Sequence, residues 1–123
     1  MRLGESLEDY LETLLLLEAS GHIRCVDVAR LMNVSKPSVN KAMNVLKDKG
    51  LVTQQVYGEI HLTEEGRALA KDIYKRHKIV KDFLMNVLGV SEENAEHDAC
   101  HIEHVISQET FERMTNYCGK KDA

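Results

Sequence analysis

The spacing of apolar residues predicts three short helices in the first part of the chain. Leucines follow Ser6 at helical intervals, so we expect a helix with Ser6 as its N-cap and Gly21 just beyond its end. A second, shorter helix is expected to begin near Val26. In a third helix, Ser35 is a suitable N-cap, and Pro37 fits the first turn, where its missing N–H costs nothing. Two short helices with a tight junction predict a helix-turn-helix.

The apolar period then changes to that of a β-hairpin and returns to that of helices. The residues around Gly58-Glu59 predict a hairpin whose apolar positions are Leu51, Val52, Val56, Tyr57, Ile60 and Leu62. Thr63 is expected to cap a long helix running to about Gly89, whose buried stripe is Ala70, Ile73, His77, Val80 and Leu84. Ser91 is expected to cap the last main helix, which carries Ala95, Ala99, Ile102, Val105 and Ile106. The residues from Gly119 onward are predicted to form a polar, frayed tail.

These elements predict a mainly α-helical protein in two parts. We expect a winged helix-turn-helix with a small β-hairpin wing over residues 1–63, and a helical domain over residues 64–123. Apolar residues make up 43% of the chain and charged residues 29%, as is ordinary for a soluble globular protein. No apolar run approaches the roughly 20 residues that span a bilayer, and no signal peptide is evident. We therefore expect a soluble, cytoplasmic protein without a membrane partner.

The net charge of −4 conceals two segments of opposite charge. From Ser20 to Tyr57, six Lys and Arg residues oppose two Asp residues, which gives a charge of +4. From Glu92 to Glu112 there are seven acidic residues and no Lys or Arg. The first segment can contact phosphates, and the second can hold cations. The three cysteines, Cys25, Cys100 and Cys118, are scattered without a CxxC motif, which argues against a disulfide framework.

The first turns of the third predicted helix carry residue types that contact DNA. Short hydroxyls, an amide and ammonium groups reach base edges and phosphates when a helix enters the major groove. The alternative is an ordinary solvated helix face, but the preceding helix, the wing and the local positive charge together favour DNA binding. The candidate DNA-binding residues are Ser35, Lys36, Pro37, Ser38, Asn40 and Lys41.

The segment CHIEH, residues 100–104, is the candidate metal site. Positions i, i+3 and i+4 share one helix face, so Cys100, Glu103 and His104 converge, with Glu96 one turn earlier. A thiolate, a carboxylate and an imidazole together suit a divalent transition ion, whereas oxygen-only sites suit calcium or magnesium. Three ligands do not complete an octahedral shell, so we expect other segments to contribute.

Two other segments offer further ligands. His77 falls within the apolar stripe of the long helix, and the alternative for it is a hydrogen-bonded core histidine. Asp9 and Glu12 stand three residues apart on the first helix. Taken alone, they are ordinary charges near a helix N-terminus, where the macrodipole favours acids.

The chain resembles, from end to end, the diphtheria toxin repressor and manganese transport regulator family of metal-dependent repressors. The segments that carry the resemblance are SLEDYLETLLLL, DVARLMNVSKPSVNKAMNVLKDKGLV, LTEEGRALA, YKRHKIVKDFL and EHDACHIEHVIS. The last is the most specific, because the signature helix of the family reads Cys or Glu, two residues, then Glu-His. The resemblance implies a winged-helix fold, a helical dimerisation domain, and binding to palindromic operators when Fe(II) or Mn(II) is present.

By position, the resemblance implies six ligands for Mn(II) or Fe(II), with one or two ions per subunit. They are Asp9, Glu12, His77, Cys100, Glu103 and His104. Cys100 resembles the iron-type members, whereas Asp9 and Glu12 resemble the manganese type. Lys81 stands where iron-type members carry an ancillary glutamate, and Glu96 replaces an ancillary histidine. The iron-type ancillary site is therefore not expected here.

The combined prediction is a metal-dependent transcriptional regulator, a repressor of metal uptake genes, and not an enzyme. Its two long apolar stripes exceed what the winged domain can cover, so we expect a homodimer on an inverted-repeat operator of double-stranded DNA. The sequence leaves open the metal, the operator, and whether Glu96 or His97 adds a ligand.

Three alternatives remain beside this prediction. A winged-helix regulator could sense redox state or a small ligand through Cys25 or Cys100, although the acids beside Cys100 disfavour a reactive thiolate. A metallohydrolase needs an open metal position and a general base, and the HExxH signature is absent. A purely structural dimerisation module would leave the basic helix-turn-helix without a role.

Overall fold

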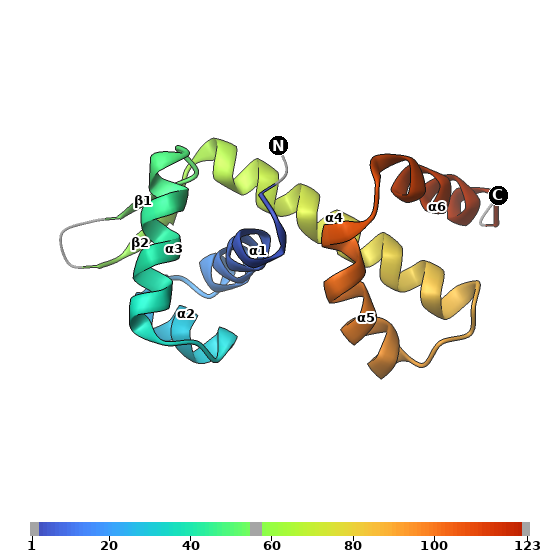
Figure 1. The fold of residues 1–123 in the computed structure, drawn as a ribbon, viewed down its shortest axis with the longest axis horizontal. Helices are drawn as coiled ribbons and strands as arrows, with labels where there is room; N and C mark the ends of the chain where they lie inside the picture. Colours follow the sequence, from blue (N-terminus) through green and yellow to red (C-terminus); the bar gives the residue numbers. More distant parts are fainter. Residues whose placement is uncertain (1–2, 55–57, 122–123) are drawn as a thin grey trace. The chain divides into compact units, whose positions relative to one another are not determined.

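The computed structural model describes residues 3–54 and 58–121 of the chain (Figure 1). Its helices and strands, in chain order, are α1 Glu5–Ala19, α2 Cys25–Met32, α3 Lys36–Asp48, β1 Val52–Gln54, β2 Ile60–Leu62, α4 Glu64–Asn86, α5 Glu92–Val105 and α6 Gln108–Lys121. Backbone contacts divide the chain into two units, Met1–Lys71 and Asp72–Ala123. The contact boundary thus falls within α4, and a functional boundary after residue 63 stays a prediction. Within the described ranges, no helix is both long and apolar enough to cross a membrane.

Helix α1 forms the centre of the first unit, where it contacts α2, α3 and β2. Its leucines Leu11 and Leu14 are fully buried. The prediction of Ser6 as the N-cap is wrong, because the helix begins at Glu5 and Gly4 occupies the cap position with φ 92°. A glycine adopts this left-handed conformation without strain and lets the chain enter the helix earlier. Ser6 therefore lies inside the first turn.

Helices α2 and α3 pack against each other as the predicted helix-turn-helix (Figure 1). Residues 33–35 connect them, and Asn33 has a left-handed φ of 56° at the end of α2. The predicted N-cap of α3 is confirmed, because the Ser35 hydroxyl accepts the Ser38 backbone N–H at 3.3 Å. The predicted apolar face of α3 is also confirmed as buried, and consists of Val39, Ala42, Met43 and Leu46.

The predicted wing is present as an antiparallel hairpin of β1 and β2. The paired residues are Val52↔Leu62, Thr53↔His61 and Gln54↔Ile60. Glu59 forms a separate bridge with Arg24, just before α2. Gly58 and Glu59 lie between the two strands, directly before β2. Val56 and Tyr57, predicted as apolar positions of the hairpin, lie outside the described residues.

The start of α4 approaches the main chain that leads into β1. The predicted cap is confirmed: the Thr63 hydroxyl accepts the Gly66 N–H at 3.0 Å and donates to the Gly50 carbonyl at 2.7 Å. A Cβ atom on Gly66 would overlap with the carbonyl oxygen of Leu51, so this close approach requires glycine. Farther along, the Arg67 guanidinium donates two hydrogen bonds to the Glu18 carboxylate of α1, at 2.7 and 3.0 Å.

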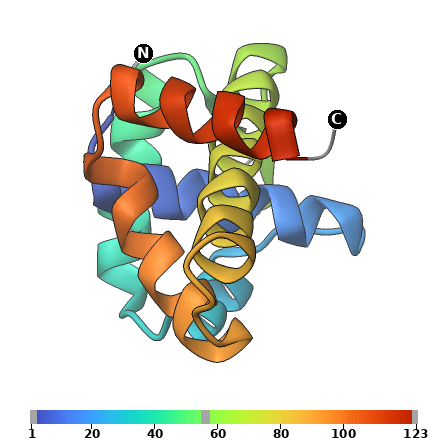
Figure 2. The same ribbon diagram turned by 90° about the vertical axis from the view of Figure 1, so that its right-hand side faces the viewer.

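The core of the second unit is formed by α4, α5 and α6 (Figure 2). Val80 and Leu84 of α4 pack with Ala95 and Ala99 of α5, and Met114 of α6 contacts this cluster. All five residues of the stripe predicted for the long helix are buried, which confirms its period; they are Ala70, Ile73, His77, Val80 and Leu84.

The prediction for the C-terminal region is wrong in one respect. The last main helix does not continue through Ile106, because α5 ends at Val105 and Ile106 adopts an extended conformation. The Ser107 hydroxyl accepts the Thr110 N–H at 3.0 Å and so caps the start of α6. A serine hydroxyl readily bonds to nearby backbone in this way, which favours starting a new helix over continuing α5. Val105, predicted as apolar-face, is 72% exposed. Residues 119–121, predicted as tail, belong to α6.

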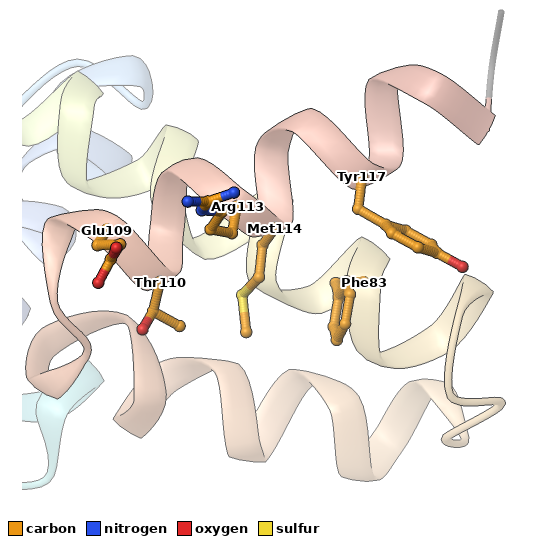
Figure 3. Close-up of a pocket in the computed structure, with 6 residues that line it drawn as sticks. All are labelled: Phe83, Glu109, Thr110, Arg113, Met114 and Tyr117. Carbon is orange, nitrogen blue, oxygen red and sulfur yellow. The ribbon is translucent and has the colours of Figure 1, made fainter.

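A groove between α4 and α6 leaves aromatic surface open to solvent (Figure 3). The cavity has a volume of about 430 Å³ and is lined by Phe83, Glu109, Thr110, Arg113, Met114 and Tyr117. The rings of Phe83 and Tyr117 meet edge to face, with centroids 6.1 Å apart. Tyr117 remains 52% exposed, so the second unit presents apolar surface that it does not cover by itself.

Candidate metal centre and nucleic-acid interface

His77 of α4 lies between two carboxylates of α5. Its Nδ1 atom is 2.8 Å from Oε2 of Glu103, and its Nε2 atom is 3.0 Å from Oε1 of Glu96. The side chains of His77 and Glu103 are 8% and 0% exposed, whereas that of Glu96 is half exposed. The predicted inward orientation of His77 is therefore confirmed, and both of its ring nitrogens face an acid.

The two carboxylates keep the imidazole of His77 protonated. The hydrogen bond to Glu103, with that to Glu96 in support, raises the pKa of His77 to about 9 against the opposing effect of burial. At neutral pH the Nε2–H group donates to Glu96, and the Nδ1–H group lies against the carboxylate of Glu103. The positively charged ring thus contacts two carboxylates at once. A divalent cation could take the place of its proton between them.

The buried pair Glu103 and His104 lies next to this contact. Oε1 of Glu103 is 3.0 Å from Nε2 of His104, and both side chains are 0% exposed. Burying a carboxylate is costly unless it is paired, so the position favours a positively charged partner. Ligand atoms of His77, Glu96 and half-buried Cys100 lie within 4.8 Å of one another. Imidazole, carboxylate and thiol donors together fit a divalent transition ion.

Four of the six predicted metal ligands lie close together within the second unit. They are His77 of α4 and Cys100, Glu103 and His104 of α5. Asp9 and Glu12 belong to α1 of the first unit, and both are half-buried. The assignment of all six residues as metal ligands stays a prediction.

Two residues at the centre were not among the predicted ligands. Glu96 contacts His77, and the signal for it was its position one helical turn before Cys100 on an acidic segment. Lys81 contacts Glu96, with Nζ 3.0 Å from Oε2, which sequence spacing did not indicate because the partners are on different helices. His97, left open as a ligand, is 76% exposed and lies with its ring 5.2 Å from that of His101.

The six predicted DNA-binding residues occupy the exposed side of the first turns of α3. They are Ser35, Lys36, Pro37, Ser38, Asn40 and Lys41, and each is exposed while the opposite face of the helix is buried. The Cys25 thiol donates to the Asn40 side-chain oxygen at 3.5 Å and accepts from the Gln54 amide at 3.6 Å. The Sγ atom of Cys25 thus links α2 to both α3 and β1 next to the exposed residues of α3. Contact of the six residues with DNA stays a prediction.

Two protein-family models match almost the whole chain. The model described as the N-terminal DNA-binding domain of iron dependent repressors matches residues 2–60. The model described as their metal-binding and dimerisation domain matches residues 63–122. The chain belongs to the iron-dependent repressor family of metal-dependent transcriptional regulators, which are not enzymes.

Individual relatives agree with this family. The transcriptional regulator MntR of Escherichia coli O157:H7 is 38% identical over 120 residues, covering 97% of this chain and 77% of the relative. An uncharacterized HTH-type transcriptional regulator of Methanocaldococcus jannaschii is 36% identical over 120 residues, covering 96% of each chain.

Two solved structures of similar fold are longer than this chain. The manganese regulator SloR is 29% identical with a TM-score of 0.80, covering 97% of this chain and 55% of that structure. IdeR of T. acidophilum is 26% identical with a TM-score of 0.78, covering 91% of this chain and 53% of that structure. The chain thus spans about half the length of these two structures.

Proposed function

We propose that this protein is a repressor that senses Mn(II) or Fe(II) and, with the ion bound, binds an inverted-repeat operator as a homodimer to control metal uptake genes. The observation that carries the proposal is His77, held between Glu103 and Glu96 next to His104 and Cys100. Similarity to a manganese regulator supports Mn(II), whereas a thiolate ligand tilts the site toward Fe(II). The proposal therefore keeps both ions.

The proposed ligands would bind one or two ions per subunit. It comprises Asp9, Glu12, His77, Cys100, Glu103 and His104. When bound, the ion would supply two positive charges to carboxylates that the protonated ring of His77 contacts in its absence. For their part, His77 gives up that proton and Cys100 gives up its thiol proton, because both bind metals in the deprotonated form. The geometry on α4 and α5 supports four ligands, and the family resemblance supports the two acids of α1.

The proposed DNA contacts come from α3 in the major groove. Ser38 and Asn40 would read base edges, while Lys36 and Lys41 would neutralise phosphates, with Ser35 and Pro37 at the helix start. The cytoplasm, where genomic DNA is available, is the proposed location. Residues 1–63 would form the DNA-binding part and residues 64–123 the metal-binding and dimerisation part.

Exposed apolar side chains support a homodimer through the second unit. Leu88, Val105 and Tyr117 are 60%, 72% and 52% exposed, and a dimer interface formed there would remove apolar surface from water. A twofold dimer would place two recognition helices about one duplex turn apart, as an inverted repeat requires.

The test is selection of operator sequences from random double-stranded DNA by the full chain. We expect inverted repeats to be enriched only with Mn(II) or Fe(II) at buffered free concentrations under anaerobic conditions. His104→Ala should give a folded dimer that no longer responds, while Lys41→Ala should weaken DNA binding but keep ion binding.

Three outcomes would contradict the proposal. One is the same enrichment in chelator as with metal, and another is a His104→Ala chain that responds with an unchanged midpoint. A metal-independent change of DNA affinity on alkylation of Cys25 would instead favour the redox-sensing alternative.

A further inference from the structure

Lys81 places a permanent positive charge beside the metal centre. It lies one helical turn after His77 on α4, and its side chain is 24% exposed. Its Nζ atom is 3.0 Å from Oε2 of Glu96 and 3.6 Å from Oε1 of Glu92, both on α5. The contact with Glu96 is short enough for a charge-assisted hydrogen bond.

Glu96 is therefore shared between two cations of the chain itself. Its two oxygens are each 3.0 Å from Nε2 of His77, and one of them also accepts from Lys81. Although burial raises the pKa of Glu96, the hydrogen bonds from His77 and Lys81 outweigh it and hold that pKa below its ordinary value. The carboxylate is thus fully charged and already paired.

The same carboxylate belongs to a group of donors that can hold an ion. We call His77, Glu96 and Cys100 the outer cluster, since their ligand atoms lie within 4.8 Å of one another. Beside it is a cavity of about 360 Å³, whose lining includes His77, Lys81, Glu92 and Glu96. An ion can therefore approach the outer cluster from solvent, and Lys81 stands at this approach.

Resting on the function proposed above, we propose that Lys81 is a specificity-determining residue whose ammonium group competes with a divalent ion for the outer cluster. An ion at Glu96 has to displace the ammonium from its carboxylate or remain close to a like charge. Both routes weaken binding. Because the lysine is tethered one turn from His77, its ammonium is always present at the cluster, whatever the metal supply.

The buried pair Glu103 and His104 escapes this competition. Glu103 contacts the other ring nitrogen of His77, Nδ1, and Lys81 has its contacts with Glu92 and Glu96. Two positions with unequal affinity follow: a tight one at Glu103 and His104, and a weak one at the outer cluster. The two positions then bind ions one after the other as the free metal concentration rises. Lys81 determines the ratio of the two dissociation constants.

The experiment is a count of bound Mn(II) per chain, with free Mn(II) measured by electron paramagnetic resonance in equilibrium dialysis of the full protein. Lys81→Met removes the charge and keeps the length of the side chain. We expect its second ion to bind on the order of tenfold tighter or more, with the first ion unchanged. Lys81→Arg, which keeps the charge, should match the original chain.

Two further variants control for position and for the carboxylate. Lys75→Met removes an exposed lysine of the same helix that is not among the residues lining this cavity, and should leave both affinities unchanged. Glu96→Gln added to Lys81→Met should cancel the gain, because the competed carboxylate is then absent. Helical circular dichroism checks that each variant is folded.

Superimposed binding curves of Lys81→Met and the original chain would overturn the inference while leaving the sensor function intact. So would an equal gain in Lys81→Arg, since the charge would then not be the cause. An original chain that binds neither Mn(II) nor, under anaerobic conditions, Fe(II) would overturn the proposed function and this inference with it.

Discussion

Binding of a divalent ion should expel the proton that His77 holds in the ion-free protein. This proton is stabilised by the carboxylates of Glu103 and Glu96 on α5. Lys81, one turn along α4, places a second positive charge on Glu96. An ion that binds to the imidazole needs the nitrogen lone pair, and an ion that binds to Glu103 cancels the negative charge that keeps the proton in place. Either way, the proton is released.

The magnitude follows from the pKa of about 9 for His77. At pH 7 the protonated form is favoured by two pH units, so its removal costs about 3 kcal/mol, or on the order of a hundredfold in apparent ion affinity. The apparent affinity should therefore rise with pH up to about 9 and then lose this dependence.

Isothermal titration calorimetry with Mn(II) at pH 7.5, in two buffers of different ionisation enthalpy, counts the protons released. The matched variant is His77→Gln, which keeps a polar side chain but cannot carry the proton. We expect the original chain to release about one proton more than this variant, because the thiol proton of Cys100 contributes equally to both. Equal proton release by the two chains would refute the reasoning.

Three other predictions concern stability and DNA binding. In chelator, the raised pKa of His77 means that its protonated ring contributes fully to stability below pH 6.5. This contribution is lost as the pH rises to about 9, so the melting temperature should fall over this window more than in His77→Gln. Gly66→Ala should gain about 1 kcal/mol of helix propensity but lose about 3 kcal/mol through overlap with the Leu51 carbonyl, and urea denaturation should show the net loss. Lys41→Ala should weaken binding to all DNA sequences and reduce its salt dependence, whereas Ser38→Ala should change sequence preference; operator titrations at several salt concentrations separate the two.

Local signals in the sequence predicted most of the elements. The cap at Ser35 and the stripe through His77 depend on residues within one or two turns, and both are present. The break between α5 and α6 was missed, because apolar spacing continues to Ile106 and no Gly or Pro interrupts it. Ser107, followed three residues later by Thr110, was the available signal.

The centre was predictable only as far as each helix carries its own pattern. Cys100, Glu103 and His104 share one face of one helix, which spacing alone shows. The contacts of His77 with Glu96 and of Glu96 with Lys81 join two helices, and no periodicity within either helix specifies which residues meet. The pairing of Glu59 with Arg24 escaped prediction for the same reason.

The early end of α5 has a consequence for the electrostatics of the metal centre. Because the helix stops at Val105, Glu103 and His104 stand in its last turn. The C-terminal end of a helix carries the equivalent of roughly half a negative charge, which acts over the last turn. Had the helix continued, the pair would lie in its interior, where this field is absent. Two unremarkable residues, Ile106 and Ser107, thus give the backbone itself a share in attracting the cation.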